Sequence, residues 1–226
     1  MSTLSPAKAN RLFWLGRYAE RIFAQLHFLR YYYDLCLDEG RDDVLLEYCR
    51  RLNLHECSQD REAFLLDHLY GGGAGSLRFC LDCLNDNSIV LREELTTATL
   101  GYANLCIATL NRCNASMTTN ITKLQPISDY ILAFWGSVLQ HVASLSSVDM
   151  LFMGRHVEYL DMYARFGYPV SRLRLDWGHL TRRMNRMEYV VDQERRNELE
   201  LLFADDALFE KSIPKVLQSL NTLVRV

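Results

Sequence analysis

A helical repeat of apolar positions runs through residues 11–28. At about 100° per residue, one face of this helix carries only small and aliphatic side chains, namely Leu12, Leu15, Ala19, Ile22 and Leu26. The opposite face carries Arg17, Glu20 and Arg21 at the spacing of helical neighbours. Aromatic side chains frame these charges on the same face: Phe13, Trp14 and Phe28. A helix that is apolar on all sides is usually buried, so we predict that the charges lie inside an apolar surface.

The same three- to four-residue period predicts helices along the whole chain and no hairpin or alternating strand. The first helix should begin at Ser5-Pro6, a serine N-cap followed by proline, and end near Gly40. We expect Ser58, residues 85–88 and residues 146–147 to start later helices. The expected helices cover residues 41–53, 58–70, 76–84, 89–117, 126–145, 146–166, 170–187, 188–203 and 205 onward. The sequence therefore predicts an all-α fold, a bundle of long helices with short connections.

The charged segment occurs twice in the chain. When Gly16 is aligned with Gly154, Arg17 falls on Arg155 and Glu20 falls on Glu158. The apolar frame recurs with the charges, because Phe13, Trp14 and Phe28 fall on Leu151, Phe152 and Phe166. The repeat predicts one domain, residues 1–226, with an internal duplication into halves of about 1–123 and 124–226. We expect the two signature helices to pack centrally about a pseudo-twofold axis.

Composition and charge narrow the classes of protein. At 226 residues with 49% hydrophobic residues, the chain can bury a large core as one domain. Its net charge of −3 is interspersed, which argues against nucleic acid as the partner. No apolar run approaches the ~20 residues that cross a bilayer. The first ten residues are polar, so we expect no secretion signal, no membrane association and a cytoplasmic location.

The cysteines and the glycine-rich segment predict little chemistry. Seven scattered cysteines without a secretion signal are expected to be reduced thiols. The pair Cys80 and Cys83 has the Cys-x-x-Cys spacing but lacks a second ligand pair, and the histidines show no metal spacing, so we expect no metal. Residues 71–75 are rich in glycine and are expected to form a flexible connection between helices. The functional alternative for this loop is a lid over the charged segment.

The charged segments supply the candidate site. Arginine forks suit carboxylate or phosphate groups, and a glutamate among arginines can accept a proton from an amine or hold an arginine in place. The candidate catalytic residues are Glu20 and Glu158, and the candidate substrate-binding residues are Arg17, Arg21, Arg155, Arg165 and His156. Two structural alternatives remain: a strip of ion pairs on a solvated face, or a buried ion network between helices. No arrangement for covalent catalysis can be assigned.

Three segments resemble a known family. Residues 12–21, Leu-Phe-Trp-Leu-Gly-Arg-Tyr-Ala-Glu-Arg, resemble the opening signature of the Alpha-E family, a predicted all-helical bacterial domain named for its Glu-Arg motif. Residues 158–165 resemble its second signature, with Tyr159 in place of the usual arginine. Residues 85–89 resemble the segment that opens the family's middle helix. By this resemblance the chain is a diverged, short member.

The resemblance implies partners as well as a fold. Alpha-E domains are typically encoded or fused with circularly permuted ATP-grasp ligases and transglutaminase-like peptidases. We therefore expect a component of an ATP-grasp-linked system that forms amide bonds or modifies peptides, with peptide or amino-acid substrates. ATP and Mg²⁺ would belong to the partner ligase, and whether this chain is itself an enzyme stays open. The alternative is a non-catalytic helical interaction module that docks a ligase or peptidase. A cleft lined by the charges would favour the first reading, and a filled, closed cluster the second.

Overall fold

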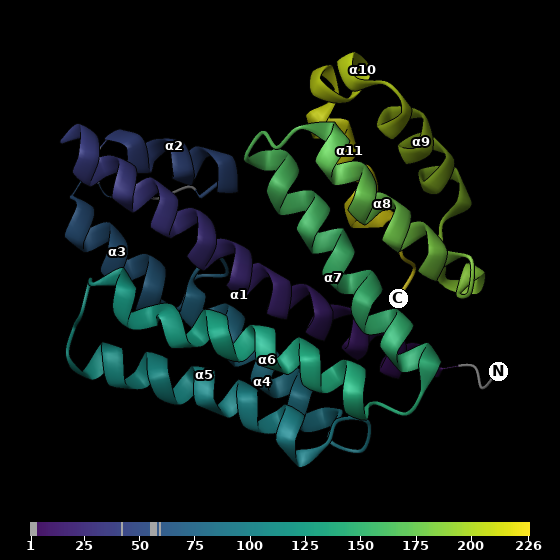
Figure 1. The fold of residues 1–226 in the computed structure, drawn as a ribbon, viewed down its shortest axis with the longest axis horizontal. Helices are drawn as coiled ribbons and strands as arrows, with labels where there is room; N and C mark the ends of the chain where they lie inside the picture. The colour runs from purple at the N-terminus through teal and green to yellow at the C-terminus, as the bar shows by residue number, and fades with distance from the viewer. Residues whose placement is uncertain (1–3, 42, 55–57, 59) are drawn as a thin grey trace. The chain divides into compact units, whose positions relative to one another are not determined.

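The structure, a computed structural model, describes residues 4–41, 43–54, 58 and 60–226, and within them it contains eleven α-helices and no β-strand (Figure 1). The predicted all-α fold class is confirmed. The only strand-like feature of the described residues is an isolated antiparallel bridge between Val191 and Val224. The helices are α1 Pro6–Glu39, α2 Asp43–Leu52, α3 Arg61–Tyr70, α4 Leu77–Val90, α5 Thr97–Ala115, α6 Gln125–His141, α7 Leu145–Arg165, α8 Val170–Met184, α9 Gln193–Ala204, α10 Asp206–Lys211 and α11 Ile213–Thr222, with 3₁₀ turns η1 Ile121–Leu124 and η2 Glu188–Val190.

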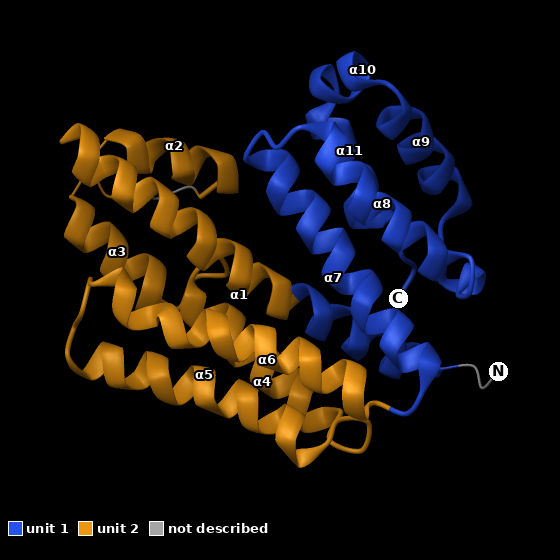
Figure 2. Cartoon of the chain, viewed as in Figure 1, with its two compact units in different colours: residues 1–17, 143–226 blue, residues 18–142 orange. Residues whose placement is uncertain are grey.

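The chain forms two compact units (Figure 2). Unit 1 contains residues 1–17 and 143–226, and unit 2 contains residues 18–142. Helix α1 therefore contributes its first turns to unit 1 and the rest of its length to unit 2. The predicted division into halves near residue 123 concerns an internal duplication of the sequence, which compact units do not test. It stays a prediction.

Helix α1 has the boundaries that its sequence predicts. It spans 34 residues, and the Ser5 hydroxyl accepts a hydrogen bond from the Lys8 amide at 3.4 Å. Pro6 opens the helix, where its missing N–H costs nothing. Gly40 follows the last turn with a φ of 64°, the left-handed conformation that glycine adopts without strain.

The predicted break at residues 85–88 is wrong, because α4 runs through it to Val90. The side chains that suggest a turn bond inside the helix instead. Asn87 donates to the Cys83 carbonyl at 2.9 Å, and the Ser88 hydroxyl donates to the Leu84 carbonyl at 2.8 Å. Asparagine and serine can bond to a carbonyl four residues back and remain helical, so their presence alone does not fix a boundary.

Two predicted N-caps are displaced by two residues. Helix α3 is capped by Asp60, whose carboxylate accepts from the Glu62 amide at 3.0 Å. The Ser58 hydroxyl accepts from the Asp60 amide, before the helix begins. Helix α7 is capped by Ser144, whose extended backbone and hydroxyl contact with the Ser147 amide mark the helix start. Neighbouring polar residues compete for the cap, and the one with an extended backbone takes it.

The glycine-rich connection between α3 and α4 is held by hydrogen bonds within unit 2. Gln25 of α1 donates to the Gly75 carbonyl at 2.9 Å, and the Ser76 hydroxyl donates to the Gly71 carbonyl at 2.6 Å. Ser76 also caps α4 by accepting from the Phe79 amide at 3.1 Å. The segment is a connection between helices, as predicted, and these anchors at its end argue against a lid.

The cysteines differ in part from the expectation of seven reduced thiols. Cys49 is disulfide-bonded, so that expectation is wrong at this position. Positions scattered along a sequence do not reveal which thiols folding brings within reach of each other. Cys57 and His55 lie outside the described residues. The free thiols of the described part are Cys36, Cys80, Cys83, Cys106 and Cys113.

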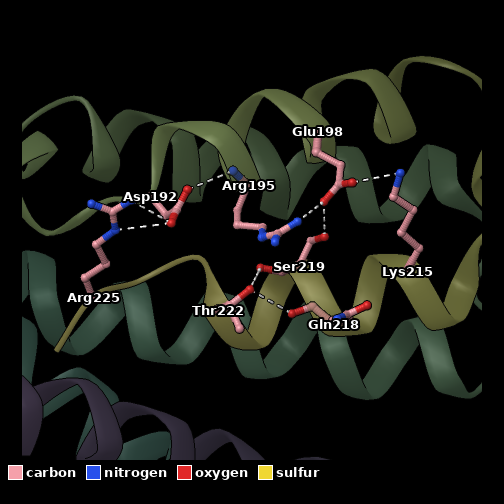
Figure 3. Close-up of polar contacts among 8 residues, drawn as sticks. All are labelled: Asp192, Arg195, Glu198, Lys215, Gln218, Ser219, Thr222 and Arg225. Atoms are coloured by element: carbon pink, nitrogen blue, oxygen red, sulfur yellow. Dashed lines mark hydrogen bonds and ion pairs between the residues drawn. The ribbon is translucent and has the colours of Figure 1, made fainter.

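Within unit 1, Figure 3 shows how the C-terminal helix α11 is tied to α9. Glu198 of α9 accepts from Lys215 at 2.7 Å, from Arg195 at 3.1 Å and from the Ser219 hydroxyl. The Lys215 contact, followed by that of Ser219, lowers the pKa of Glu198 to about 2. The carboxylate is therefore ionised at neutral pH and holds two helices together.

The last residues of the chain return to the start of α9. The Asp192 amide donates to the Leu223 carbonyl at 2.8 Å, and the Arg225 amide donates to the Val190 carbonyl at 2.7 Å. The Asp192 carboxylate also accepts from the Arg225 guanidinium at 2.8 Å, which Figure 3 shows beside the Arg195 contact. Both ends of α11 are thereby fixed within unit 1.

Two glycines let α1 and α7 touch backbone to backbone inside unit 1. A Cβ atom added at Gly16 would lie 2.0 Å from the Leu151 carbonyl oxygen. One added at Gly154 would lie 2.0 Å from the Phe13 carbonyl oxygen. A Cβ atom cannot approach an oxygen this closely, so any larger residue must push the helices apart.

The contact is reciprocal. Each glycine meets the carbonyl three residues before the other glycine, and each added Cβ would lie 3.1 Å from the amide nitrogen of Arg155 or Arg17. Such mutual pairing is the pattern that a local twofold axis generates. It concerns the crossing of α1 and α7, and the duplication of whole halves stays a prediction.

No helix of the described residues is both long enough and apolar enough to cross a bilayer.

We predict that Gly154→Ala lowers the free energy of unfolding by roughly 1–3 kcal/mol or more, because the added methyl overpacks the crossing. The matched control is Gly136→Ala in α6, where an added Cβ meets nothing within 4 Å. The control should gain about 0.5–1 kcal/mol, since alanine loses less conformational freedom in a helix than glycine. Urea denaturation measures both. A Gly154→Ala protein as stable as the control would contradict the close crossing.

A buried histidine in unit 2 gives a second test. The Tyr48 hydroxyl lies 2.8 Å from Nε2 of His68, and the His68 ring stacks on Phe64 with centroids 5.3 Å apart. His68 is 4% exposed, and this burial lowers its pKa from 6.5 to about 4. The neutral imidazole is therefore the form that the folded protein holds.

We predict that His68 makes the protein acid-sensitive. Between pH 6.5 and about 4 the unfolded chain binds a proton that folded His68 does not, so stability falls as pH decreases through this window. The full effect is on the order of 3 kcal/mol. Urea denaturation at several pH values measures it, and His68→Gln should flatten the slope between pH 6.5 and 5. An unchanged slope in that variant would show that His68 is not the cause of the acid sensitivity.

Candidate functional site

The centre of the predicted site in unit 1 is an ion pair between α1 and α7. Arg17 Nε donates to Glu158 Oε2 at 2.7 Å. The side chains of Arg17 and Glu158 are 4% and 1% exposed. The glycine crossing positions both, because Arg17 follows Gly16 directly and Glu158 lies one helical turn after Gly154. The pair is buried, as the apolar frame in the sequence predicts.

Other parts of the Arg17 guanidinium also contact the protein. One terminal nitrogen, NH2, donates to Asn221 Oδ1 at 2.8 Å. The guanidinium carbon lies 4.9 Å from the centre of the Trp14 ring and 5.9 Å from that of Phe13, within the range of cation–π attraction. The predicted aromatic frame therefore contacts the charge itself. Glu158, Asn221 and the two rings together enclose the cation.

Asn221 extends the network to a second arginine. Its amide nitrogen donates to Asp161 Oδ2 at 2.9 Å and to the Leu217 carbonyl at 2.8 Å. Asp161 Oδ1 accepts from Arg165 Nε at 2.6 Å. The contacts form a continuous chain from Glu158 through Arg17, Asn221 and Asp161 to Arg165. Asn221 is exposed and 24% of the Arg165 side chain is exposed, so the network reaches solvent at both residues.

Glu20 and Arg21 belong to the part of α1 that lies in unit 2. Glu20 is 2% exposed, and Arg21 is half-buried with its guanidinium 5.9 Å from the Tyr18 ring. Burial, followed by a hydrogen bond with Cys83, raises the pKa of Tyr18 to about 12. Within unit 1 the structure brings Arg17, Glu158 and Arg165 into one network.

Arg155 and His156 lie on α7, beside Phe152. The Arg155 guanidinium is 5.6 Å from the Phe152 ring centre, and that of Arg183 from α8 is 4.4 Å from the same ring. His156 Nδ1 lies 2.9 Å from Asp176 Oδ1 of α8. Burial lowers the pKa of His156 from its usual 6.5, against the opposing effect of Asp176, and the two arginines lower it further.

Asp149 is an additional buried acid at the start of α7. It is 1% exposed and accepts from Arg183 NH1 at 2.7 Å and from Arg186 Nε at 2.7 Å. Sequence reasoning missed Asp149, Asp176 and Asn221. A lone acid in the apolar start of α7 was a usable signal for Asp149. Asp176 and Asn221 lie on exposed amphipathic helices and carry no such signal.

No group of three or more histidine, cysteine or acidic side chains is placed to hold a metal ion in the part of the chain that the structure describes. The expectation that Cys80, Cys83 and the candidate site bind no metal stays a prediction.

The fold and the network define a class of protein: an all-helical protein in which a glycine crossing buries an arginine–glutamate pair. A family model, Alpha-E, described as "a predicted alpha-helical domain with a conserved ER motif", matches residues 4–205. The chain belongs to the Alpha-E family. Comparisons with curated proteins and with solved structures found no match. In this chain the matched residues contain Glu-Arg dipeptides at Glu20-Arg21 and Glu194-Arg195, and Asn221 lies beyond them.

We predict that the buried pair is a strong stability determinant. Arg17→Met removes the cation 2.7 Å from buried Glu158, and Glu158→Gln removes the charge that Arg17 pairs with, so each should cost about 3–5 kcal/mol. The double variant should recover much of this loss, because it removes both charges. Urea denaturation measures all three.

The control for these variants is an exposed pair. Arg41 lies 2.7 Å from Asp43, with side chains 61% and 56% exposed, so Arg41→Ala should change stability little. Single variants of the buried pair that match this control would show that Arg17 and Glu158 do not hold the fold.

Proposed function

We propose that this protein is a component of an ATP-grasp-linked system that forms amide bonds or modifies peptides. Its membership of the Alpha-E family supports this proposal, through the association with ligases and peptidases that the family resemblance implies. In this proposal a partner ATP-grasp ligase holds ATP and Mg²⁺, and a transglutaminase-like peptidase is the other candidate partner. The substrates are peptides or amino acids.

The burial of Arg17 and Glu158 is the observation that favours one mode of action. Arg17 is 4% exposed, its Nε and NH2 are bonded inside the protein and its guanidinium contacts two rings, so little of it is open to a substrate. Glu158, at 1% exposed, is closed to an amine in the same way. We therefore assign Arg17 and Glu158 a structural role. The protein acts in the system by docking to the ligase with its helical surface, and any contact with the reacting groups is made by side chains other than this pair.

A second candidate function keeps substrate binding within the charged segments. The partial exposure of Arg165, and of Arg21 and Arg155, favours it, because a half-buried guanidinium can still donate to a carboxylate or an acyl phosphate. In this version these arginines, rather than Arg17, contact the ligand. Glu20 would then act as a base toward the amine or orient an arginine.

The test is reconstitution with the ATP-grasp ligase encoded nearest to this gene. We expect a complex by calorimetric titration and more amide product per ATP consumed when the protein is present. The stable double variant Arg17→Met/Glu158→Gln should keep both properties if the pair is architecture. A ligase that neither binds the protein nor changes its product yield would overturn the proposed function.

Substrate-contact variants separate the two modes. If the protein only docks, Arg165→Ala and Glu20→Gln should keep the product yield once they are shown to be folded. If the charged segments bind substrate, Arg165→Ala should raise the KM for the acceptor substrate and leave the Kd for the ligase unchanged. Loss of product yield with an unchanged Kd for the ligase, in the double variant alone, would show that Arg17 contacts the substrate.

A further inference from the structure

His156 of unit 1 is oriented by an acid on the neighbouring helix. Its Nδ1 lies 2.9 Å from Asp176 Oδ1, and the contact joins α7 to α8, which follow one another in Figure 1. An ionised carboxylate can only accept a hydrogen bond, so Nδ1 carries the proton and donates it. Nε2 is then the atom with a free lone pair. A carboxylate that fixes the tautomer in this way makes the opposite nitrogen a better base.

Two other rings pack beside the His156 ring. The His179 ring stacks on it at 5.6 Å with an interplanar angle of 8°, and the tilted Phe152 ring lies at 6.1 Å. His156 as a whole is 8% exposed. Nε2 takes no hydrogen bond within the described residues and is not sealed from solvent. Nε2 is therefore the ring nitrogen that a small group entering from solvent can meet.

Burial favours the neutral form of His156. It lowers the pKa of the ring, Asp176 raises this pKa, and Arg183 on α8 and Arg155 on the same helix lower it further. His179 on α8 is itself bonded through Nδ1 to Arg182 NH2, at 2.6 Å. At neutral pH His156 is consequently an unprotonated base with a defined free nitrogen.

We propose that His156 accepts the proton of the acceptor amine when this system forms its amide bond, with Asp176 as the positioning residue and His179 as a cover. This inference rests on the proposed function and assigns it a base. The co-reactant is an acyl phosphate that the ligase makes from ATP. The amine nitrogen forms a bond to the acyl carbon, the bond from that carbon to the phosphate oxygen breaks, and the electron pair leaves with phosphate. The nitrogen's proton passes to Nε2 and then to solvent.

The competing explanation is that His156 and Asp176 only link two helices. Both explanations predict lower stability when the link is cut, so stability cannot separate them. They differ in the chemistry of Nε2. A base needs an accessible lone pair at this atom, and a linking residue does not.

The first experiment uses the protein alone. Diethyl pyrocarbonate acylates a neutral imidazole nitrogen, and peptide mass spectrometry then reports each histidine separately. We expect His156 to react in the folded protein and to react several-fold faster in His179→Ala, which uncovers the ring. His68, whose Nε2 is bonded to Tyr48 and which is 4% exposed, is the internal control and should stay unmodified. A His156 as protected as His68 in both proteins overturns the proposal.

The second experiment uses the reconstituted ligase system. General-base catalysis is worth roughly 100- to 10,000-fold, so His156→Ala should lower kcat by at least about 100-fold. Added imidazole should restore part of the rate, which a structural role would not allow. Asp176→Asn should also lower kcat, with a changed pH profile and little change in KM. His141→Gln, an exposed histidine at the end of α6, is the matched control and should keep full activity.

The outcomes separate this inference from the proposed function. A folded His156→Ala protein that keeps its kcat, or loses it without any imidazole rescue, overturns the proton-acceptor role and leaves the proposed function intact. A ligase that neither binds the wild-type protein nor changes its product yield overturns the proposed function. The role of His156 as proton acceptor is overturned with it. Loss of kcat with imidazole rescue, together with a reactive His156, supports the role.

Discussion

The close crossing of α1 and α7 is the constraint on which the buried charges of unit 1 depend. Gly16 and Gly154 remove the two Cβ atoms that would separate the backbones, so the residues directly beside the two glycines lie close together. At that separation Arg17 Nε lies 2.7 Å from Glu158 Oε2, and both side chains are buried. An ion pair in such surroundings loses its hydration and is acceptable only when its geometry is close and its other donors are bonded.

Helix α11 supplies one of the hydrogen bonds that the buried pair needs. Asn221 of α11 accepts from Arg17 and donates to Asp161, so one amide serves a cation and an anion at once. Helix α11 is in turn held to α9 by Glu198 and by Asp192 with Arg225. The family match ends at residue 205, so this support comes from a part of the chain beyond it. Because Arg17 and Glu158 are enclosed, the candidates for contact with a ligand are the groups on α7 and α8 that still reach solvent.

Much of the fold could be predicted from the sequence, because long helices with apolar stripes are strong local patterns. The limits of α1 and the end of α7 at Gly167 follow from proline, serine and glycine at the right places. The boundary between α4 and α5 could not be predicted. Asn87 and Ser88 satisfy carbonyls inside α4, and only the neighbouring helices decide whether such residues cap or continue.

For the candidate site, the sequence by itself determined that Arg17 and Glu158 sit in apolar frames, since helical spacing fixes which residues share a face. It also marked His156 as a neighbour of Arg155. Only the tertiary structure decided that Arg17 pairs with Glu158 and Asn221, and His156 with Asp176 and His179. These partners lie on other helices, and their distances depend on how closely the helices cross. Periodicity along one helix carries no information about that separation.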